Sequence, residues 1–130
     1  KISEIFSSFN DIPVAAASIA QVHKAVLVTG QKVAVKILRP DITRTYNNDI
    51  IFLEFIASVT AKFVRSSQRF KPREVIAVFR ESMNCELNLL MEAAAASRLA
   101  DNFALDKSIC IPKIYWDLTS EEIITLEWIN

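Results

Sequence analysis

The chain has 130 residues and a formal net charge of zero, with 15 Lys and Arg against 15 Asp and Glu. Balanced charge argues against a bulk nucleic-acid binder, because phosphate neutralisation needs clustered excess positive charge. A content of 52% hydrophobic and 23% charged residues is typical of one globular domain rather than of a disordered chain. The single glycine excludes Walker, Rossmann and EF-hand loops, and one histidine with two cysteines excludes a Cys/His zinc site.

Two further features set expectations about the whole protein and its compartment. The chain begins with Lys1 rather than Met, so we expect a processed product or an excerpt of a longer protein. No stretch approaches the roughly 18 uncharged apolar residues that a membrane span needs. Cys85 and Cys110 are expected to be buried free thiols, which fits a reducing compartment.

The first forty residues predict a lead-in followed by a β-hairpin. Residues 1–12 mix apolar and polar residues and are predicted to form a short helix or an extended segment. Gln21–Val28 alternates in part, and Lys32–Leu38 reads K-V-A-V-K-I-L, which is rich in β-branched residues. Thr29-Gly30-Gln31 is the predicted turn, because glycine adopts positive φ without strain.

Two helices are predicted to follow the hairpin. Ile42–Val64 contains neither Pro nor Gly, and its apolar residues recur at helical spacing. Ser66-Ser67-Gln68 is a polar break. Pro72 then opens a second helical pattern, which predicts one helix of about thirty residues that ends near Phe103.

Two strands are predicted to complete the chain. Ile109–Asp117 and Ile123–Ile129 are apolar stretches joined by the polar segment Thr119–Glu122. The order of hairpin, helices and hairpin predicts an α+β fold, with a small antiparallel sheet and two long helices packed on one side of it. Because the sequence stops directly after the last strand, we expect a second lobe to be missing.

A lysine on the second strand is the first candidate for chemistry. In Val33-Ala34-Val35-Lys36 the lysine alternates with aliphatic residues. On a concave sheet face such a lysine can reach phosphate oxygens as a point charge. The commoner role of a lone strand lysine is that of a solvated charge.

An alanine-rich segment is the second candidate. Ala15-Ala16-Ala17-Ser18 lies in a predicted loop, where Gly, Asn, Asp and Pro are usual. Its backbone could approach an anion closely, or the segment could be a buried stretch of small residues. His23, a few residues later, could act as a general base, but a lone strand histidine is more often structural.

Three polar residues of the predicted long helix are the third candidate: Glu86, Asn88 and Glu92. Two residues six positions apart lie about 120° apart around a helix and about 9 Å apart along it, so the two glutamates cannot form one carboxylate pair. A helical glutamate is usually solvated. Glu92 lies among leucines and alanines, however, and is expected to be partly buried beside a partner.

Five segments occur together in order: P-V-A-A-A-S-I-A-Q-V-H-K-A, V-A-V-K-I-L-R-P, C-E-L-N-L-L-M-E-A-A-A-A-S-R-L-A-D-N-F, I-P-K-I-Y-W-D and I-T-L-E-W-I-N. With this combination, from about Phe9 to Asn130, the chain resembles the UbiB (aarF-domain) family of atypical protein-kinase-like proteins. The alanine-rich loop followed by S-I-x-Q-V-H is the most specific part. The resemblance implies that residues 1–130 form the amino-terminal lobe of a kinase-like domain, without its carboxy-terminal lobe.

The resemblance also implies a role for each candidate residue. Lys36 would hold the α- and β-phosphates of ATP or ADP, and Glu92 would pair with it in a buried ion pair; these two are the candidate catalytic residues. The alanine-rich loop would replace the usual glycine-rich lid, and Ala34 would line the nucleotide pocket. Leu126 would be the gatekeeper. The backbone of the hinge, with Glu127 and Ile129, would bind adenine.

The sequence departs from the family pattern in several places. The family helix motif E-x-D would begin at Glu86, but Asn88 stands in the place of its Asp. The family's K-x-G-Q segment, its catalytic-loop Asp and its magnesium-binding Asp are not present in this sequence. The chain alone is therefore not expected to be a competent catalyst or to hold a metal, and the Mg²⁺ ligands are expected in the missing lobe.

The resemblance finally implies a biological setting. The chain would be the ATP-binding portion of a UbiB-like kinase or ATPase that supports ubiquinone biosynthesis. Expected partners are nucleotide with Mg²⁺, the carboxy-terminal lobe and membrane-bound quinone-biosynthesis proteins, with no nucleic acid. The expected location is the cytoplasmic side of a bacterial inner membrane, or the mitochondrial inner membrane or matrix. The alternatives are a truncated non-catalytic remnant or partner-binding module, and a generic α+β binding domain with a chance resemblance.

Overall fold

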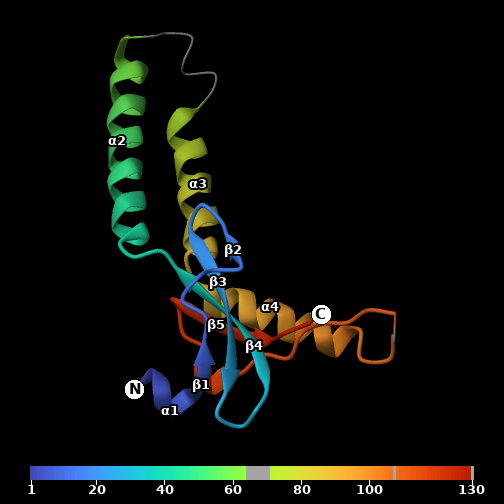
Figure 1. The fold of residues 1–130 in the computed structure, drawn as a ribbon. Helices are drawn as coiled ribbons and strands as arrows, with labels where there is room; N and C mark the ends of the chain where they lie inside the picture. The colour runs from blue at the N-terminus through green and yellow to red at the C-terminus, as the bar shows by residue number, and fades with distance from the viewer. Residues whose placement is uncertain (64–70, 107, 130) are drawn as a thin grey trace. The chain divides into compact units, whose positions relative to one another are not determined.

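The computed structural model describes residues 1–63, 71–106 and 108–129, which belong to two compact units (Figure 1). The first, the sheet unit, comprises Lys1–Arg39 and Leu87–Asn130. The second, the helical unit, comprises Pro40–Glu86.

The sheet unit is built on a five-stranded antiparallel sheet with the order β1-β3-β4-β5, in which β2 also pairs with β3. A short helix α1, Ile2–Ile5, precedes the first strand. The strands are β1 Phe6–Phe9, β2 Ala15–Ala16, β3 Ala20–Leu27, β4 Lys32–Leu38 and β5 Ile123–Glu127. This sheet confirms the predicted α+β class and the predicted β3–β4 hairpin. The lead-in contains both a short helix and a strand, the two alternatives expected for residues 1–12.

The β3–β4 turn depends on its glycine. Gly30 has a φ of 91°, and its N–H donates to the Leu27 carbonyl at 2.9 Å. The Leu27 N–H in turn donates to the Gln31 carbonyl at 2.9 Å and closes the turn. A side chain at this φ would be strained, which explains why the one glycine of the chain occurs here.

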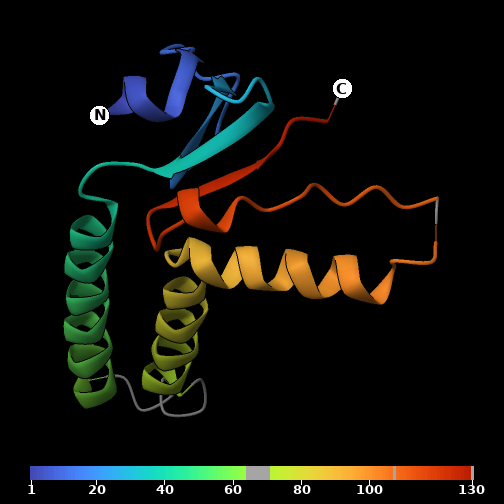
Figure 2. The same cartoon turned by 90° about the horizontal axis from the view of Figure 1, so that it is seen from below.

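Side chains alternate between two faces of this sheet, because residues directly opposite each other on paired strands share a face. The outer face carries the buried cluster Ala25, Leu27, Val33 and Val35, with Phe6, Phe9, Tyr115 and Leu118 packed against it. The inner face carries Val22, Ala34, Lys36, Ile124 and Leu126 by strand register. Helix α4, Leu89–Asn102, contacts β5 and runs beside the sheet (Figure 2).

The second long helix is broken into two, contrary to the prediction of one helix from Pro72 to Phe103. Helix α3 spans Pro72–Glu86, and α4 begins at Leu89. Asn88 between them is extended, with φ −120° and ψ 96°, and its side chain accepts a hydrogen bond from the Leu90 N–H at 3.0 Å. The apolar residues keep their helical spacing across the break. Asn88, however, caps the start of α4, and its extended backbone does not continue α3.

The strand predicted over Ile109–Asp117 is also wrong. That segment contributes one bridge, between Ile114 and Leu126, and then a 3-10 turn η2 at Trp116–Leu118. The Tyr115 N–H still donates to the Thr125 carbonyl at 2.9 Å, so the segment touches the edge of β5 briefly. Pro112 lacks a donor for a longer ladder. Strand β5 itself ends at Glu127, two residues before the predicted end.

The helical unit is an antiparallel pair formed by α2, Ile42–Phe63, and α3 (Figures 1 and 2). The predicted end of α2 at Val64 and the polar break Ser66-Ser67-Gln68 lie outside the described residues. Tyr46, Ile50 and Ala57 are buried. The Tyr46 hydroxyl donates to the Phe79 carbonyl at 3.2 Å and ties the two helices together.

The two cysteines differ from their predicted burial. Cys85 and Cys110 are free thiols, but both are exposed rather than buried. Cys85 occupies the last turn of α3, which buries no residue, and Cys110 lies in the irregular segment before the 3-10 turn. Across the described ranges, no helix combines the length and the apolar character needed to cross a membrane.

Candidate phosphate-binding site

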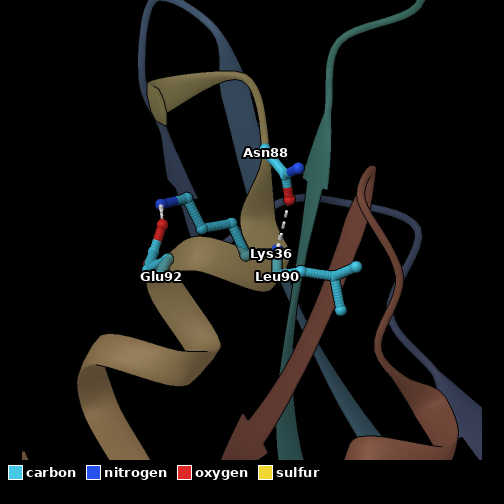
Figure 3. Close-up of polar contacts among 4 residues, drawn as sticks. All are labelled: Lys36, Asn88, Leu90 and Glu92. Carbon is cyan, nitrogen blue, oxygen red and sulfur yellow. Dashed lines mark hydrogen bonds and ion pairs between the residues drawn. The ribbon is translucent and has the colours of Figure 1, made fainter. Parts of the chain in front are cut away.

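An ion pair on the inner face of the sheet is the centre of the candidate site. The Lys36 Nζ lies 2.6 Å from Glu92 Oε2, and the two side chains point toward each other from β4 and α4 (Figure 3). The lysine side chain is 25% exposed and the glutamate 46%. The expectation of a buried pair is therefore wrong. Solvent reaches both partners of the pair.

The start of α4 determines where Glu92 stands. Asn88 caps the helix, and the Leu89 N–H donates to the Glu121 carbonyl at 2.8 Å, just before β5. Leu89 and Ala93 are fully buried, so the first turn has one orientation relative to the sheet. Glu92 lies in that first turn, where a negative charge also interacts favourably with the helix dipole. The cap and two apolar anchors thus aim the carboxylate at β4.

The ion pair has a positional consequence more than an energetic one. Pairs this accessible to solvent contribute only about 0–1 kcal/mol to stability. Glu92 nevertheless restrains a long, flexible lysine side chain to one region of the inner face. The arrangement can present an ammonium group to phosphate oxygens at a low cost in ordering.

The alanine-rich segment forms a tight hairpin beside this lysine strand. Ala15 and Ala16 make up β2 and pair with Val22 and Gln21 of β3. The Ala17 N–H donates to the Ala20 carbonyl at 2.9 Å and closes the turn around Ser18. All four residues from Ala15 to Ser18 are exposed, so the alternative of a buried packing stretch is wrong. Ala15 pairs with Val22 on β3, and Val22 pairs with Lys36 on β4. These three residues therefore share the inner face, and the β2 arm of the hairpin is separated from the lysine strand by β3 alone.

The predicted hinge residues lie at the far side of β4. Leu126 pairs with Ala34 and shares the inner face with it, whereas Glu127 pairs with Val33 and shares the outer face. The Trp128 N–H donates to the Lys32 carbonyl at 3.1 Å, and the Glu127 N–H donates to the Lys113 carbonyl at 2.9 Å. Hydrogen-bonded and non-bonded pairs alternate in an antiparallel ladder, so the Glu127 carbonyl points away from β4.

The structure thus brings several predicted residues to one face and leaves others apart. Lys36, Glu92, Ala34 and Leu126 meet at the inner face, with the alanine-rich hairpin beside them. Ile129 follows β5 and is exposed. Glu86 ends α3 in the helical unit, so its part in the family helix motif stays a prediction. Asn88 serves as a helix cap, a role that needs no charge.

His23 has a structural role. It lies opposite Val35 on the outer face, away from Lys36, and is 8% exposed. Its Nδ1 is 2.9 Å from the Asn10 carbonyl, so this nitrogen carries the proton and donates. The ring also stacks on Phe9 with centroids 5.3 Å apart. The burial of the ring and its place on the face opposite Lys36 favour the structural role over the general-base alternative.

Two residues near the site were missed by sequence reasoning. Lys24 pairs with Ala34 on the inner face, and its Nζ lies 4.4 Å from the centroid of the Trp128 ring. The strand alternation that selected Lys36 would have placed Lys24 on the same face. Arg39 donates from its Nε to the Ala17 carbonyl at 3.1 Å. No sequence signal predicts this second contact, because it depends on where the hairpin turns.

Lys36, restrained by Glu92, offers one cation for an anionic ligand. Throughout the described ranges, no three His, Cys, Asp or Glu side chains gather closely enough to hold a metal ion. A lysine restrained by one carboxylate suits an anion that arrives with its own cation.

Outside the site, hydrogen bonds from the side chain and backbone of Ser108 lower the pKa of the Asp106 carboxyl, in the loop after α4.

Comparison with known proteins decides the family. A family model described as "ABC1 atypical kinase-like domain" matches residues 1–130. The chain belongs to this family. Proteins named "Probable protein kinase UbiB" are similar to it: one from Marinobacter nauticus is 40% identical over 129 residues, and one from Pseudomonas fluorescens is 38% identical over 127 residues. These alignments cover 99% and 98% of this chain and 24% of each relative.

One solved structure is similar to this chain over its whole length. The Mycobacterium tuberculosis protein Rv3197, determined in complex with erythromycin, superposes with a TM-score of 0.84 at 31% sequence identity. The match covers 100% of this chain and 32% of that protein. The chain therefore spans about a quarter of the length of the curated relatives and a third of the solved one. The predicted atypical kinase-like family and fold class are confirmed.

Proposed function

We propose that this ABC1-family chain binds the phosphate groups of ATP or ADP on the inner face of its sheet. The observation that carries the proposal is the 2.6 Å ion pair between Lys36 and Glu92. A strand lysine restrained by a helix glutamate is the arrangement by which kinase-like proteins present an ammonium to the α- and β-phosphates. The partial exposure of the pair supports the proposal, because a phosphate must reach the Nζ.

The backbone of β5 supports a place for the adenine ring. In the proposed complex the Glu127 carbonyl, which points away from β4, accepts a hydrogen bond from the exocyclic amine of the base. Ala34 and Leu126 lie opposite each other on the inner face and give the ring an apolar floor of one small and one large side chain. The distance along β4 from Ala34 to Lys36 then separates the base from the phosphates.

The rest of the reaction is proposed to depend on other parts of the whole protein. Phosphoryl transfer or hydrolysis needs Mg²⁺ and a residue that orients the nucleophile. The described residues offer no cluster of metal ligands. We propose that a carboxy-terminal lobe supplies these groups, and that this chain contributes the phosphate lysine, its glutamate and the hinge. When bound, Mg²⁺ would neutralise charge on the phosphates as they react.

The biological setting is proposed from the family and from the names of the relatives. The similar proteins carry the name UbiB, which supports a role of the whole protein in ubiquinone biosynthesis. We propose that it works with membrane-bound quinone-biosynthesis proteins, on the cytoplasmic side of a bacterial inner membrane or at the mitochondrial inner membrane. A nucleic-acid partner is not proposed, since the chain has no net positive charge.

Calorimetric titration of the full-length protein with Mg-ATP and Mg-ADP tests the proposal. Lys36→Met should weaken nucleotide binding by about tenfold or more, because a charge-assisted contact to phosphate contributes about 1.5–3 kcal/mol. Lys71→Met is a matched control, since Lys71 also pairs with a glutamate, Glu74 at 2.8 Å, in the helical unit. Equal affinities for the two variants would contradict the proposal. Absence of nucleotide binding by the wild-type protein would favour a non-catalytic binding module.

A further inference from the structure

Arg39 holds the alanine-rich hairpin through both its backbone and its side chain. The Arg39 N–H donates to the Ile19 carbonyl at 2.8 Å, which continues the β3–β4 ladder past the end of β4. Its Nε donates to the Ala17 carbonyl at 3.1 Å. The two accepting carbonyls flank Ser18, the residue at the turn. One arginine therefore fastens both sides of the hairpin tip to the end of the lysine strand.

The two bonds act on different parts of the hairpin. The backbone bond belongs to the ladder and would survive any change of the side chain. The side-chain bond crosses from the end of β4 to the tip, where the only local closure is the Ala17 N–H bond to the Ala20 carbonyl at 2.9 Å. A guanidinium donor gives a stronger hydrogen bond than a neutral group would. The Arg39 side chain is thus the external restraint on the tip.

We propose that Arg39 is a positioning residue that latches the alanine-rich hairpin in its closed position and thereby slows the entry and exit of nucleotide. This inference rests on the proposed function, because the hairpin borders the inner face at Lys36. The hairpin contains no glycine, so its own backbone has few alternative conformations. Lifting the tip from the sheet then requires the Arg39 contact to Ala17 to break.

The latch predicts a kinetic effect larger than its effect on affinity. The contact joins two groups of the protein itself, so we expect its loss to speed opening in both the free and the nucleotide-bound protein. For Arg39→Met we expect the association and dissociation rate constants of nucleotide to rise together by about three- to tenfold, with a smaller change in Kd. Methionine keeps most of the aliphatic stem and leaves the backbone bond to Ile19 in place, so the variant is expected to fold.

Stopped-flow measurement of a fluorescent ADP analogue with the full-length protein tests the latch. Arg39→Lys retains a cationic donor at nearly the same reach and should restore rates to between those of wild type and Arg39→Met. Arg98→Met, which removes an exposed arginine from α4, is the matched control and should leave both rates unchanged. Unchanged rates in Arg39→Met, or rates that fall, would overturn the inference while leaving nucleotide binding itself intact.

Amide hydrogen exchange of the nucleotide-free protein provides a test that does not depend on nucleotide. The Ala17 amide, which donates to the Ala20 carbonyl, should exchange about three- to tenfold faster in Arg39→Met than in wild type, with little change in the helical unit. Equal exchange in the two proteins would overturn the latch even if the wild type bound no nucleotide. Failure of the proposed function would instead appear as an absent fluorescence signal in the wild type, with faster exchange in the variant.

Discussion

Lys36 and Glu92 are 56 residues apart in sequence, yet Nζ and Oε2 are 2.6 Å apart across the inner face of the sheet. Their meeting depends on the strand alternation of β4 and on the capped start of α4. Since the two side chains remain partly exposed, the pair orients an ammonium more than it stabilises the fold.

The ion pair between Lys36 and Glu92 should contribute little to the free energy of unfolding. A double-mutant cycle with Lys36→Met and Glu92→Gln should give a coupling free energy of unfolding of about 1 kcal/mol or less, because solvent screens the pair. Urea denaturation of the four proteins measures it. A coupling free energy of several kcal/mol would contradict this expectation. It would mean that the ion pair stabilises the fold despite its exposure to solvent.

Asn88 should be replaceable by another helix cap but not by alanine. Asn88→Ala removes the acceptor for the Leu90 N–H and should cost about 1 kcal/mol in the free energy of unfolding. Asn88→Asp keeps the acceptor and places a negative charge at the helix start, so its stability should match wild type within a few tenths of a kcal/mol. Chemical denaturation of both variants provides the comparison. If Asn88→Asp proved as damaging as Asn88→Ala, the capping account would be wrong.

His23 should matter for stability and not for nucleotide binding. His23→Ala removes the hydrogen bond to the Asn10 carbonyl and the stacking on Phe9, and should lower the free energy of unfolding by about 1–3 kcal/mol. Nucleotide affinity, measured by titration under conditions where the variant is folded, should be unchanged because His23 is on the outer face. A selective loss of affinity or turnover with stability retained would restore the general-base alternative.

Gly30 should resist substitution for a backbone reason alone. No atom lies within 4 Å of the position that a Cβ would occupy, so Gly30→Ala meets no steric clash. The φ of 91° is nevertheless unfavourable for a residue with a side chain, and the substitution should cost about 1–2 kcal/mol. Thermal unfolding of Gly30→Ala and Gly30→Asn tests this, with asparagine expected to be the milder change. A neutral Gly30→Ala would show that the turn relaxes to negative φ.

Local patterns were sufficient for the lysine hairpin. Alternation and β-branched residues placed β4 at Lys32–Leu38, and the single glycine placed its turn. The helix prediction failed at Asn88, because apolar residues at helical spacing continue from α3 into α4 and do not reveal the capping residue between the two helices. The strand prediction over Ile109–Asp117 failed because apolar residues there contact β5 at one bridge only. The first failure comes from a local capping bond between the Leu90 N–H and the Asn88 side chain, and the second from a segment that forms one bridge instead of a ladder.

The candidate site shows the same division. Lys36 and Glu92 were predicted from the family resemblance, and the structure places them together. The degree of burial could not be read from the neighbouring leucines and alanines, since only Leu89 and Ala93 of those turn fully inward. The Arg39 contact to Ala17 joins segments 22 residues apart and depends on the hairpin geometry. No sequence spacing encodes it.

A structure of the full-length protein with Mg²⁺ and a non-hydrolysable ATP analogue tests the central claim most directly. The account predicts phosphate oxygens within about 3 Å of Lys36 Nζ, with Glu92 still paired to that lysine. It also predicts the adenine beside Ala34 and Leu126, with its exocyclic amine donating to the Glu127 carbonyl. A nucleotide bound elsewhere, or one whose phosphates make no contact with Lys36, would contradict the assignment of the inner face as the phosphate-binding site.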